Sequence, residues 1–506
     1  MRVFFLFFLF STSLSAQIIQ NVEIEVVGRP SWQTIIPFGK DGMLLLTKTD
    51  QTKAKVVMFD ADLNKKWETD IFLDVERSPT SYSFDKEQIT FLFRETRGMY
   101  YQVYIFDLAT GKYQNKGFEV REFFDDQNYI FLKNKILMAG ATTKGAGFYS
   151  FDFESEEGKV IEIDIRGKVV LQDLKFVEKS NLIKTIWSVK ELAYSNPKRK
   201  KGEYVKDAYL AIADFDTSGK VLNISKITQK SGNFPMTAKS LTMLDGRELI
   251  SGTYQNKTGD NGLFIAFRNQ SEISTPSFIS YARFLYGNTD SNRDELKKLL
   301  KDYRFLMHFP VENDGFFSVG GVFFKPEFQS RQVSDAYSSS SAATRGISFG
   351  RPSSRTQTLL AGYTYLTGFV ANIKPNGELL NTNKIDIKQS STQLRQTLSF
   401  NSAGAVAYCI KGDLAARNFN IGTKPILYKL SDEDKSVSNQ SYLPAYQEVR
   451  FWYDNYFVAN GAKNKIEVLK LEKKGPFKKK KKNQNSTFTQ VRKTIYLTKI
   501  ASGISD

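Results

Sequence analysis

Short apolar segments recur along this chain, and polar turns of two kinds separate them. A turn of the first kind precedes an apolar segment such as MLLLT or ITFLF, and it lies at 40–42, 85–86, 133–134, 179–181, 245–246, 314–315, 402–404 and 454–455. A turn of the second kind divides the next pair of segments, as in FDADLNKKW from Phe59, FDLATGKY from Phe106 and DFDTSGKV from Asp214. Asp, Asn and Gly gather at these turns because hairpins need positive φ or side-chain-to-backbone hydrogen bonds. Each unit therefore predicts four strands.

The spacing of the units predicts the fold. Successive turns of the first kind are 44, 49, 46, 65, 69, 89 and 51 residues apart. A basic period near 45 residues is typical of four-stranded propeller blades. Segments such as QVYIFDL (102–108) have neighbouring apolar residues, which indicates strands covered on both faces. We predict an all-β fold, a single β-propeller of eight four-stranded blades over residues 17–506, with seven blades as the alternative. Gln20–Val27 is expected to add a strand that helps to close the ring.

Three insertions interrupt the repeat. Residues 288–303 contain Leu296, Leu299, Leu300 and Tyr303 at helical spacing after a capping-box-like Ser291 and Asp294, which predicts one inserted short helix. Residues 335–358 are rich in Ser, Gly and Arg without periodicity, which predicts a mobile loop. Residues 473–488 predict a basic loop.

The turns and several longer stretches resemble a group of uncharacterised secreted β-propeller-like repeat proteins of Bacteroidota. The resemblance rests on the repeated FD…GK turns, on residues 303–328 and 362–387, and on the closing RKTIYLTKI at 492–500. It implies a propeller fold and export. It carries no functional residue to this chain.

The first 16 residues have the order of a secretory signal peptide. Arg2 precedes the apolar run Val3–Phe10, and the small polar segment Ser11–Ala16 follows it. Eight apolar residues are too few to span a bilayer as a helix, and no other run is long enough. We predict cleavage after Ala16 and an exported chain in the periplasm, on the outer surface or outside the cell. The single Cys does not follow the signal, so a lipid anchor on cysteine is not expected.

Composition narrows the chemistry. The chain has one His and one Cys, which excludes an internal disulfide and two-His or Cys-rich metal sites. His308 lies among apolar residues and is interpreted as a structural imidazole, and Cys409 as a buried core residue. No G-x-S-x-G motif supports a serine hydrolase. We predict no catalytic, cofactor-binding or metal-binding residue, and no cofactor.

Acidic residues leave one enzymatic alternative open. Glu122, Asp125 and Asp126 form the densest acidic group, and a glycan-active enzyme would place two such carboxylates across a glycosidic bond at the mouth of the channel. Asp60, Asp62 and Asn64 match the start of a calcium loop, but apolar Ile71 stands where such a loop carries Glu. We interpret that segment as a capped hairpin turn.

Charge is concentrated in two runs. The chain has 71 basic and 54 acidic residues, and without the eleven basic residues within 198–201 and 473–482 the net charge of +17 would be +6. The candidate anion-binding residues are Lys198, Arg199, Lys200, Lys201, Lys478, Lys479, Lys480, Lys481 and Lys482. The alternative interpretation is that both runs are solvated loops that keep the protein soluble.

These observations predict a monomeric, non-enzymatic binding or scaffold propeller that presents loops to an envelope protein, an acidic glycan or a lipopolysaccharide surface. A glycan-active enzyme is the alternative. Nucleic acid is not expected as a partner, because the chain has no nucleic-acid-binding motif.

Overall fold

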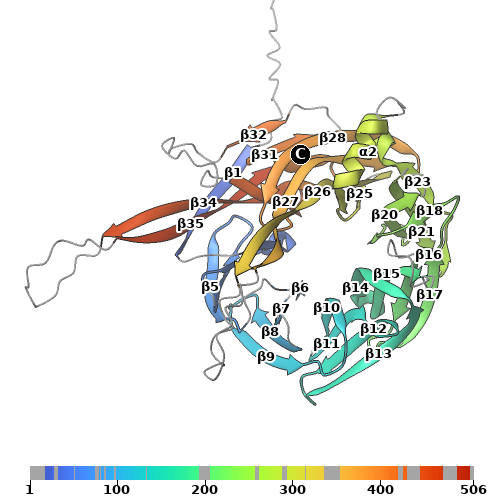
Figure 1. Cartoon of the computed structure of the whole chain (residues 1–506), viewed down its shortest axis with the longest axis horizontal. Helices are drawn as coiled ribbons and strands as arrows, with labels where there is room; N and C mark the ends of the chain where they lie inside the picture. The colour runs from blue at the N-terminus through green and yellow to red at the C-terminus, as the bar shows by residue number, and fades with distance from the viewer. Residues whose placement is uncertain are drawn as a thin grey trace, which may run out of the picture.

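Eight antiparallel β-sheets stand around a ring in the computed structural model (Figure 1). The structure describes residues 17–27, 32–50, 52–74, 79, 81–84, 87–95, 99–132, 134–192, 205–256, 261–287, 293–313, 315–334, 354–419, 425–429, 445–470 and 487–501. The fold is an eight-bladed β-propeller, as the repeat predicts, and the seven-bladed alternative is wrong.

The first four blades each use four consecutive strands, with the first strand innermost. Blade 1 comprises β2 (Gln33–Pro37), β3 (Met43–Lys48), β4 (Lys53–Phe59) and β5 (Lys65–Phe72). Blade 2 comprises β6 (Ser81–Phe84), β7 (Gln88–Arg94), β8 (Tyr100–Asp107) and β9 (Tyr113–Glu119). Blade 3 comprises β10 (Asp125–Leu132), β11 (Lys135–Ala141), β12 (Gly145–Asp152) and β13 (Glu157–Arg166). Blade 4 comprises β14 (Lys168–Val177), β15 (Leu182–Leu192), β16 (Val205–Phe215) and β17 (Val221–Ile227).

The innermost strands of blades 5 and 6 are each broken into two pieces. Blade 5 comprises β18 (Asn233–Pro235) and β19 (Lys239–Thr242), then β20 (Glu248–Asn256), β21 (Gly262–Asn269), β22 (Glu272–Ile273) and β23 (Ser277–Ser280). Blade 6 comprises β24 (Arg304–Met307) and β25 (Val311–Asn313), then β26 (Phe316–Ser334), β27 (Ser354–Ile373) and β28 (Leu379–Ser391). Blade 7 comprises β29 (Leu398–Phe400), β30 (Ala405–Ile410), β31 (Asp413–Asn418) and β32 (Ile426–Tyr428).

Blade 8 joins the two ends of the chain. Its inner strands are β33 (Ala445–Tyr453), β34 (Tyr456–Lys470) and β35 (Thr487–Ala501), and its outermost strand is the N-terminal β1 (Gln17–Val27). In Figure 1 the blue β1 lies beside the red strands of the chain's end. The register pairs Ile24 with Ile495 and Val26 with Lys493. The predicted closing strand is therefore confirmed.

Buried side chains hold neighbouring blades together. Among the described residues the buried apolar side chains form eight clusters, one at each interface between blades. Aromatic rings dominate several of them: Trp67 stacks on Phe106, with ring centroids 6.2 Å apart, where blade 1 meets blade 2. Such pairs contribute about 0.5–1.5 kcal/mol each beyond area burial. Because each sheet is covered on both faces, its strands show the neighbouring apolar residues seen in the sequence.

The predicted turns of the first kind join the first and second strands of each blade, and those of the second kind at Phe59, Phe106 and Asp214 join the third and fourth strands of blades 1, 2 and 4. In blade 8 the third and fourth strands, β35 and β1, come from opposite ends of the chain, so the turn of the second kind expected there is not found.

Gly42 shows why a turn of the first kind needs glycine: its φ is +130°, and a Cβ there would lie 2.0 Å from the carbonyl oxygen of Phe59. The Asp60 turn is a capped hairpin, because one carboxylate oxygen accepts the backbone N–H groups of Asp62 and Asn64, both at 2.8 Å.

The insertions match their predictions only in part. Helix α2 (Arg293–Asp302) lies within 288–303, and its Leu296 and Leu299 are buried between blades 5 and 6. A second helix, α1 (Tyr281–Tyr286), was not predicted. Among the described residues, neither helix is long and apolar enough to cross a membrane.

Two predicted loops end too late. Residues 335–353 and 473–486 lie outside the described residues. However, Ser354–Thr358 begin β27, and residues 487–488 begin β35, so the loop predictions are wrong there. Pairing with the facing strand overrides the polar composition: Ser354 is the partner of Ser334, and Thr487 is the partner of Lys470.

Two hairpins extend well beyond their blades. Strands β26 and β27 have 19 and 20 residues, whereas β34 and β35 have 15 each. In Figure 1 the β34–β35 hairpin runs out past the ring. Both join the second and third strands of a blade. In antiparallel blades with their first strands innermost, all such connections leave from the same face of the propeller.

Closure of the ring predicts a stability effect at β1. Ile24→Asp should lower the free energy of unfolding by at least about 2 kcal/mol, because it places a carboxylate against the buried Ile495. Glu23→Gln, at an exposed position of the same strand, should change it by less than about 0.5 kcal/mol. Denaturant unfolding measures both. Equal effects of the two substitutions would show that β1 does not support the ring.

Candidate functional site: the central channel

Two hollows lie along the axis of the ring and share the side chain of Tyr82. The larger has a volume of about 1240 Å³ and is lined mainly by the innermost strands of blades 2 to 4, including Tyr82, Thr90, Asn128, Lys135 and Lys175. The smaller has a volume of about 450 Å³ and is lined from blades 1, 2, 6, 7 and 8. We call them the wide hollow and the narrow hollow.

A group of charged side chains forms one wall of the narrow hollow. Glu448 and Arg450 alternate along β33, and Arg395 precedes β29. The Glu448 carboxylate accepts from Arg395 Nη1 at 3.1 Å and from Arg450 Nε at 2.7 Å. Arg450 Nη1 also donates to the Tyr82 hydroxyl at 3.3 Å, and Arg395 Nη1 donates to the carbonyl of Gln33 at 2.5 Å. These bonds hold both guanidinium groups in place through partners on blades 1, 2 and 8.

The two guanidinium groups line the narrow hollow, whereas Glu448 does not. The Glu448 side chain is only 1% exposed, against 23% for Arg450. Although burial opposes the charged form, the nearby Glu448 and Tyr82 raise the pKa of Arg450 above its usual value. The wall therefore presents permanent positive charge to the hollow.

A break in blade 6 forms the opposite wall. Strand β24 ends at Met307 and β25 begins at Val311, and Pro310 between them has no N–H to give to the ladder. The break places Phe309 at the channel with 53% of its surface exposed. The ammonium groups of Lys175 and Lys239 lie 5.3 and 4.8 Å from the centroid of its ring. Phe309 is therefore a partly exposed aromatic ring in cation–π contact with two lysine ammonium groups.

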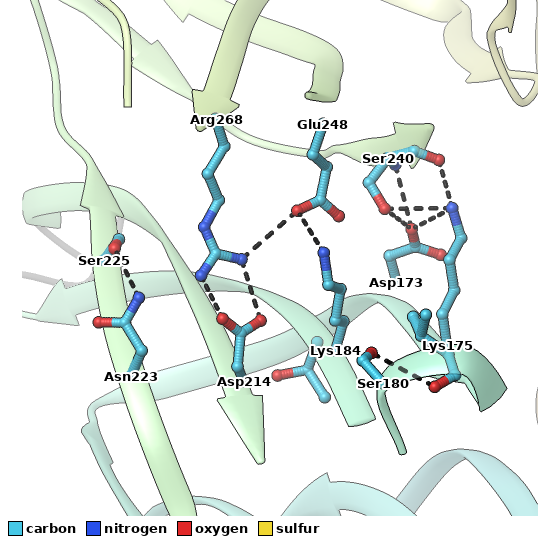
Figure 2. A network of polar contacts seen from close by, with 12 residues as sticks. Asp173, Lys175, Ser180, Lys184, Asp214, Asn223, Ser225, Ser240, Glu248 and Arg268 are labelled. Atoms are coloured by element: carbon cyan, nitrogen blue, oxygen red, sulfur yellow. Dashed lines mark hydrogen bonds and ion pairs between the residues drawn. The ribbon is translucent and has the colours of Figure 1, made fainter. Parts of the chain in front are cut away.

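Both lysines are held by blades 4 and 5, and Figure 2 shows the contacts of Lys175. Lys175 Nζ lies 3.3 Å from the Asp173 carboxylate and also donates to Ser240, whose hydroxyl donates to Asp173 at 2.8 Å. Lys239 Nζ donates to the carbonyl of Gln172 at 2.7 Å, and burial lowers the pKa of Lys239. The Asp173 carboxylate is thus paired with Lys175 and hydrogen-bonded to Ser240.

A second ionic network in Figure 2 is structural. The Arg268 side chain is 2% exposed and lies between the carboxylates of Asp214 and Glu248, and Lys184 binds Glu248 at 3.1 Å. These four residues join blades 4 and 5. Removing one partner of such a buried group costs about 3–5 kcal/mol, because a charge is left unpaired.

The charged residues among the described lining of the channel are mainly cationic. The basic residues that line the two hollows are Lys135, Lys175, Lys179, Arg395 and Arg450. Glu178 is the one carboxylate among the described lining residues, and it lies at an exposed turn of the wide hollow. The two facing carboxylates that a glycosidase needs are therefore not found among these residues.

The acidic group predicted for that enzyme is not assembled at the channel. Asp126 accepts from the Tyr101 hydroxyl at 2.6 Å and pairs with Arg94, which ties blade 3 to blade 2. Asp125 is exposed, and Glu122 lines a separate groove of about 700 Å³ together with Arg121 and Glu156.

The remaining predicted residues behave as follows. Cys409 is fully buried, and burial raises the pKa of its thiol. His308 is buried at the break in blade 6, and its Nε2 has no hydrogen-bond partner among the described residues. The candidate anion-binding residues of 198–201 and 478–482 lie outside the described residues. They connect β15 to β16 and β34 to β35.

The sequence reading missed Arg395, Arg450 and Phe309. One signal was present: QEVRFW places Glu448 and Arg450 two residues apart shortly before the predicted turn at 454–455, and in a strand both would point to one face. Two charged residues on the side of a strand that faces the axis indicate a channel with a charged lining. Arg395 and Phe309 carried no comparable signal.

Comparisons with known proteins find distant structural similarity and no family. No family model matches this chain, and no curated relative matches it. The propeller of Dos1 is similar over 74% of this chain and 75% of its own, with 12% identity and a TM-score of 0.39. The β-propeller domain of the Trilobed protease from Pyrococcus furiosus is similar over 84% of this chain and 100% of its own, with 10% identity and a TM-score of 0.35. A prolyl endopeptidase is similar over 87% of this chain and 54% of its own, with 10% identity and a TM-score of 0.43.

His308 predicts a pH dependence of stability. Burial, and then the charge of Arg450, lowers the pKa of His308 from 6.5 to about 4. In the unfolded chain His308 therefore binds a proton near pH 6.5, whereas in the folded chain it does so only near pH 4. The free energy of unfolding accordingly decreases as the pH falls from 6.5 towards 4. At pH 5 the loss relative to pH 7 should be about 2 kcal/mol.

The single His of the chain makes this test clean. Unfolding should be measured at pH 7, 6 and 5 for the natural protein and for His308→Gln, which cannot titrate. The natural protein should lose about 2 kcal/mol more than the variant over this range. Parallel curves would mean that His308 is protonated as easily in the folded state as in the unfolded state.

Proposed function

We propose that this chain is an exported, non-enzymatic binding propeller that presents basic connections to an anionic envelope surface, such as lipopolysaccharide or an acidic glycan. The proposal of export rests on the signal-like order of Met1–Ala16. The structural support is the strand order: both basic runs lie between the second and third strands of a blade.

A shared face matters because the fields of the two runs then add. Blade 4 carries 198–201 between β15 and β16, and blade 8 carries 478–482 between β34 and β35. The turns between first and second strands lie on the opposite face, where Lys40 of blade 1 pairs with Asp454 of blade 8 at 2.8 Å. An anionic surface could therefore contact both runs at once.

The enzymatic alternative receives less support. It requires two convergent carboxylates, and the described lining of the two hollows contains only Glu178. We therefore favour binding and propose no catalytic residue.

Removing either run should weaken binding to anionic vesicles. The first variant changes 198–201 to Ser, which removes four positive charges, and the second changes 478–482 to Ser. Each should weaken binding to vesicles that contain lipopolysaccharide by at least about tenfold, since a basic residue near an anionic membrane contributes about 1 kcal/mol. Binding of the natural protein should fall between 0.1 and 1 M salt, where the Debye length decreases from about 10 to about 3 Å.

A control with the same loss of charge is available on the other face. Lys40, Lys66, Lys112 and Lys220 are exposed at or beside turns that join first to second or third to fourth strands. Changing these four to Ser should leave binding within about twofold of the natural protein. If this control weakens binding as much as the first variant, only net charge matters. If no variant weakens binding, the basic runs are not the binding surface.

A further inference from the structure

The narrow hollow combines an apolar interior with one charged wall. Apolar side chains form most of its lining, among them Leu306, Met307, Phe309, Phe400 and Phe451. Its polar lining is small: the two guanidinium groups, the Tyr82 hydroxyl, His308, Gln396 and Ser399. Its volume of about 450 Å³ is in the range of small-molecule sites, which are mostly apolar with a few convergent polar groups.

The charge of the wall is not balanced within it. Arg395 and Arg450 carry two positive charges, and Glu448 behind them carries one negative charge. His308, which also lines the hollow, is neutral above about pH 4. On the Phe309 side, Lys175 and Lys239 face the single carboxylate of Asp173. The two guanidinium groups and Glu448 therefore carry one net positive charge. The Phe309 side also carries one when Lys175 and Lys239 are both protonated.

We propose that the narrow hollow is a binding site for an organic carboxylate with an apolar body. The carboxylate lies against Arg450, whose planar guanidinium suits two-point contact with a carboxylate. The apolar body covers Phe309 and Leu306, and burial of apolar surface there contributes about 25 cal/mol per Å². This site is separate from the proposed basic face, so either proposal can fail without the other.

The lining argues against more polar ligands. A sugar would bring many hydroxyl groups, and each one that is buried without a partner costs about 1–3 kcal/mol. Beside the charged groups, the described lining offers them Tyr82, His308, Gln396 and Ser399. A monocarboxylate matches both the charge and the apolar surface.

The same chemistry belongs to free small acids and to the C-terminal end of a peptide. The narrow hollow adjoins the wide one at Tyr82, which leaves room for a longer chain beyond the site. Phenylacetate and a dipeptide that ends in a free Phe carboxylate serve as probes for the two sources. Tighter binding of the dipeptide assigns the site to peptide ends, and tighter binding of phenylacetate assigns it to small acids.

Isothermal titration of the chain without residues 1–16 tests the site. Phenylacetate should bind saturably, and phenylacetamide, which has the same shape without the charge, should bind at least about tenfold more weakly. Arg450→Gln should abolish measurable binding of phenylacetate. Equal binding of phenylacetate and phenylacetamide, or no binding of either phenylacetate or the dipeptide at 10 mM (roughly the weak limit of measurable affinity), would overturn the proposal.

A substitution at the exposed ring avoids the risk that Arg450→Gln fails to fold. Phe309 is 53% exposed, so Phe309→Ala should leave the fold intact while weakening phenylacetate binding about fivefold or more. Phe72→Ala is the matched control, because Phe72 is 61% exposed on β5 and also has a lysine ammonium near its ring, that of Lys53 at 5.3 Å. It should leave binding unchanged. Equal effects of the two Phe→Ala substitutions would overturn the proposal.

Discussion

The requirement that every sheet be covered on both faces determines the rest of this structure. A single four-stranded blade buries neither of its apolar faces alone, and only a closed ring gives each blade two neighbours. Eight clusters of buried side chains, one for each interface, are the result. The aromatic residues that fill them set the distance between blades and therefore the diameter of the channel. The side chains of the innermost strands line that channel.

The character of the channel lining thus depends on departures from regular pairing. The breaks in β18–β19 and β24–β25 interrupt the innermost ladder of two neighbouring blades. One break presents Phe309, and the other precedes Lys239, which meets the same ring. Elsewhere the innermost strands carry side chains that are bonded into the wall. The channel is therefore asymmetric, with its cationic and aromatic groups concentrated on particular blades.

The sequence predicted the fold well because the turns are local. The Asp60 carboxylate caps its own turn and Gly42 supplies a positive φ, so each leaves a mark within a few residues. The channel could not be found in that way. Tyr82, His308, Arg395 and Arg450 are far apart along the chain, and only the closed ring brings them to one hollow. Helix α1 was missed because six residues are too few for a helical period to show. The polar start of β27 was taken for a loop because its strand character comes from its partner β26.

The position of β1 has a kinetic meaning as well. Ile24 must find Ile495, so the contact that completes blade 8 spans almost the whole chain. Until synthesis reaches β35, the N-terminal strand has no partner, and the outer faces of the first and last blades remain uncovered. Contacts of such high sequence separation form slowly, and unpaired edges favour association between chains in the meantime. A chain of this design is exposed to misassembly until β35 is made, because the pairing of β35 with β1 removes that exposure.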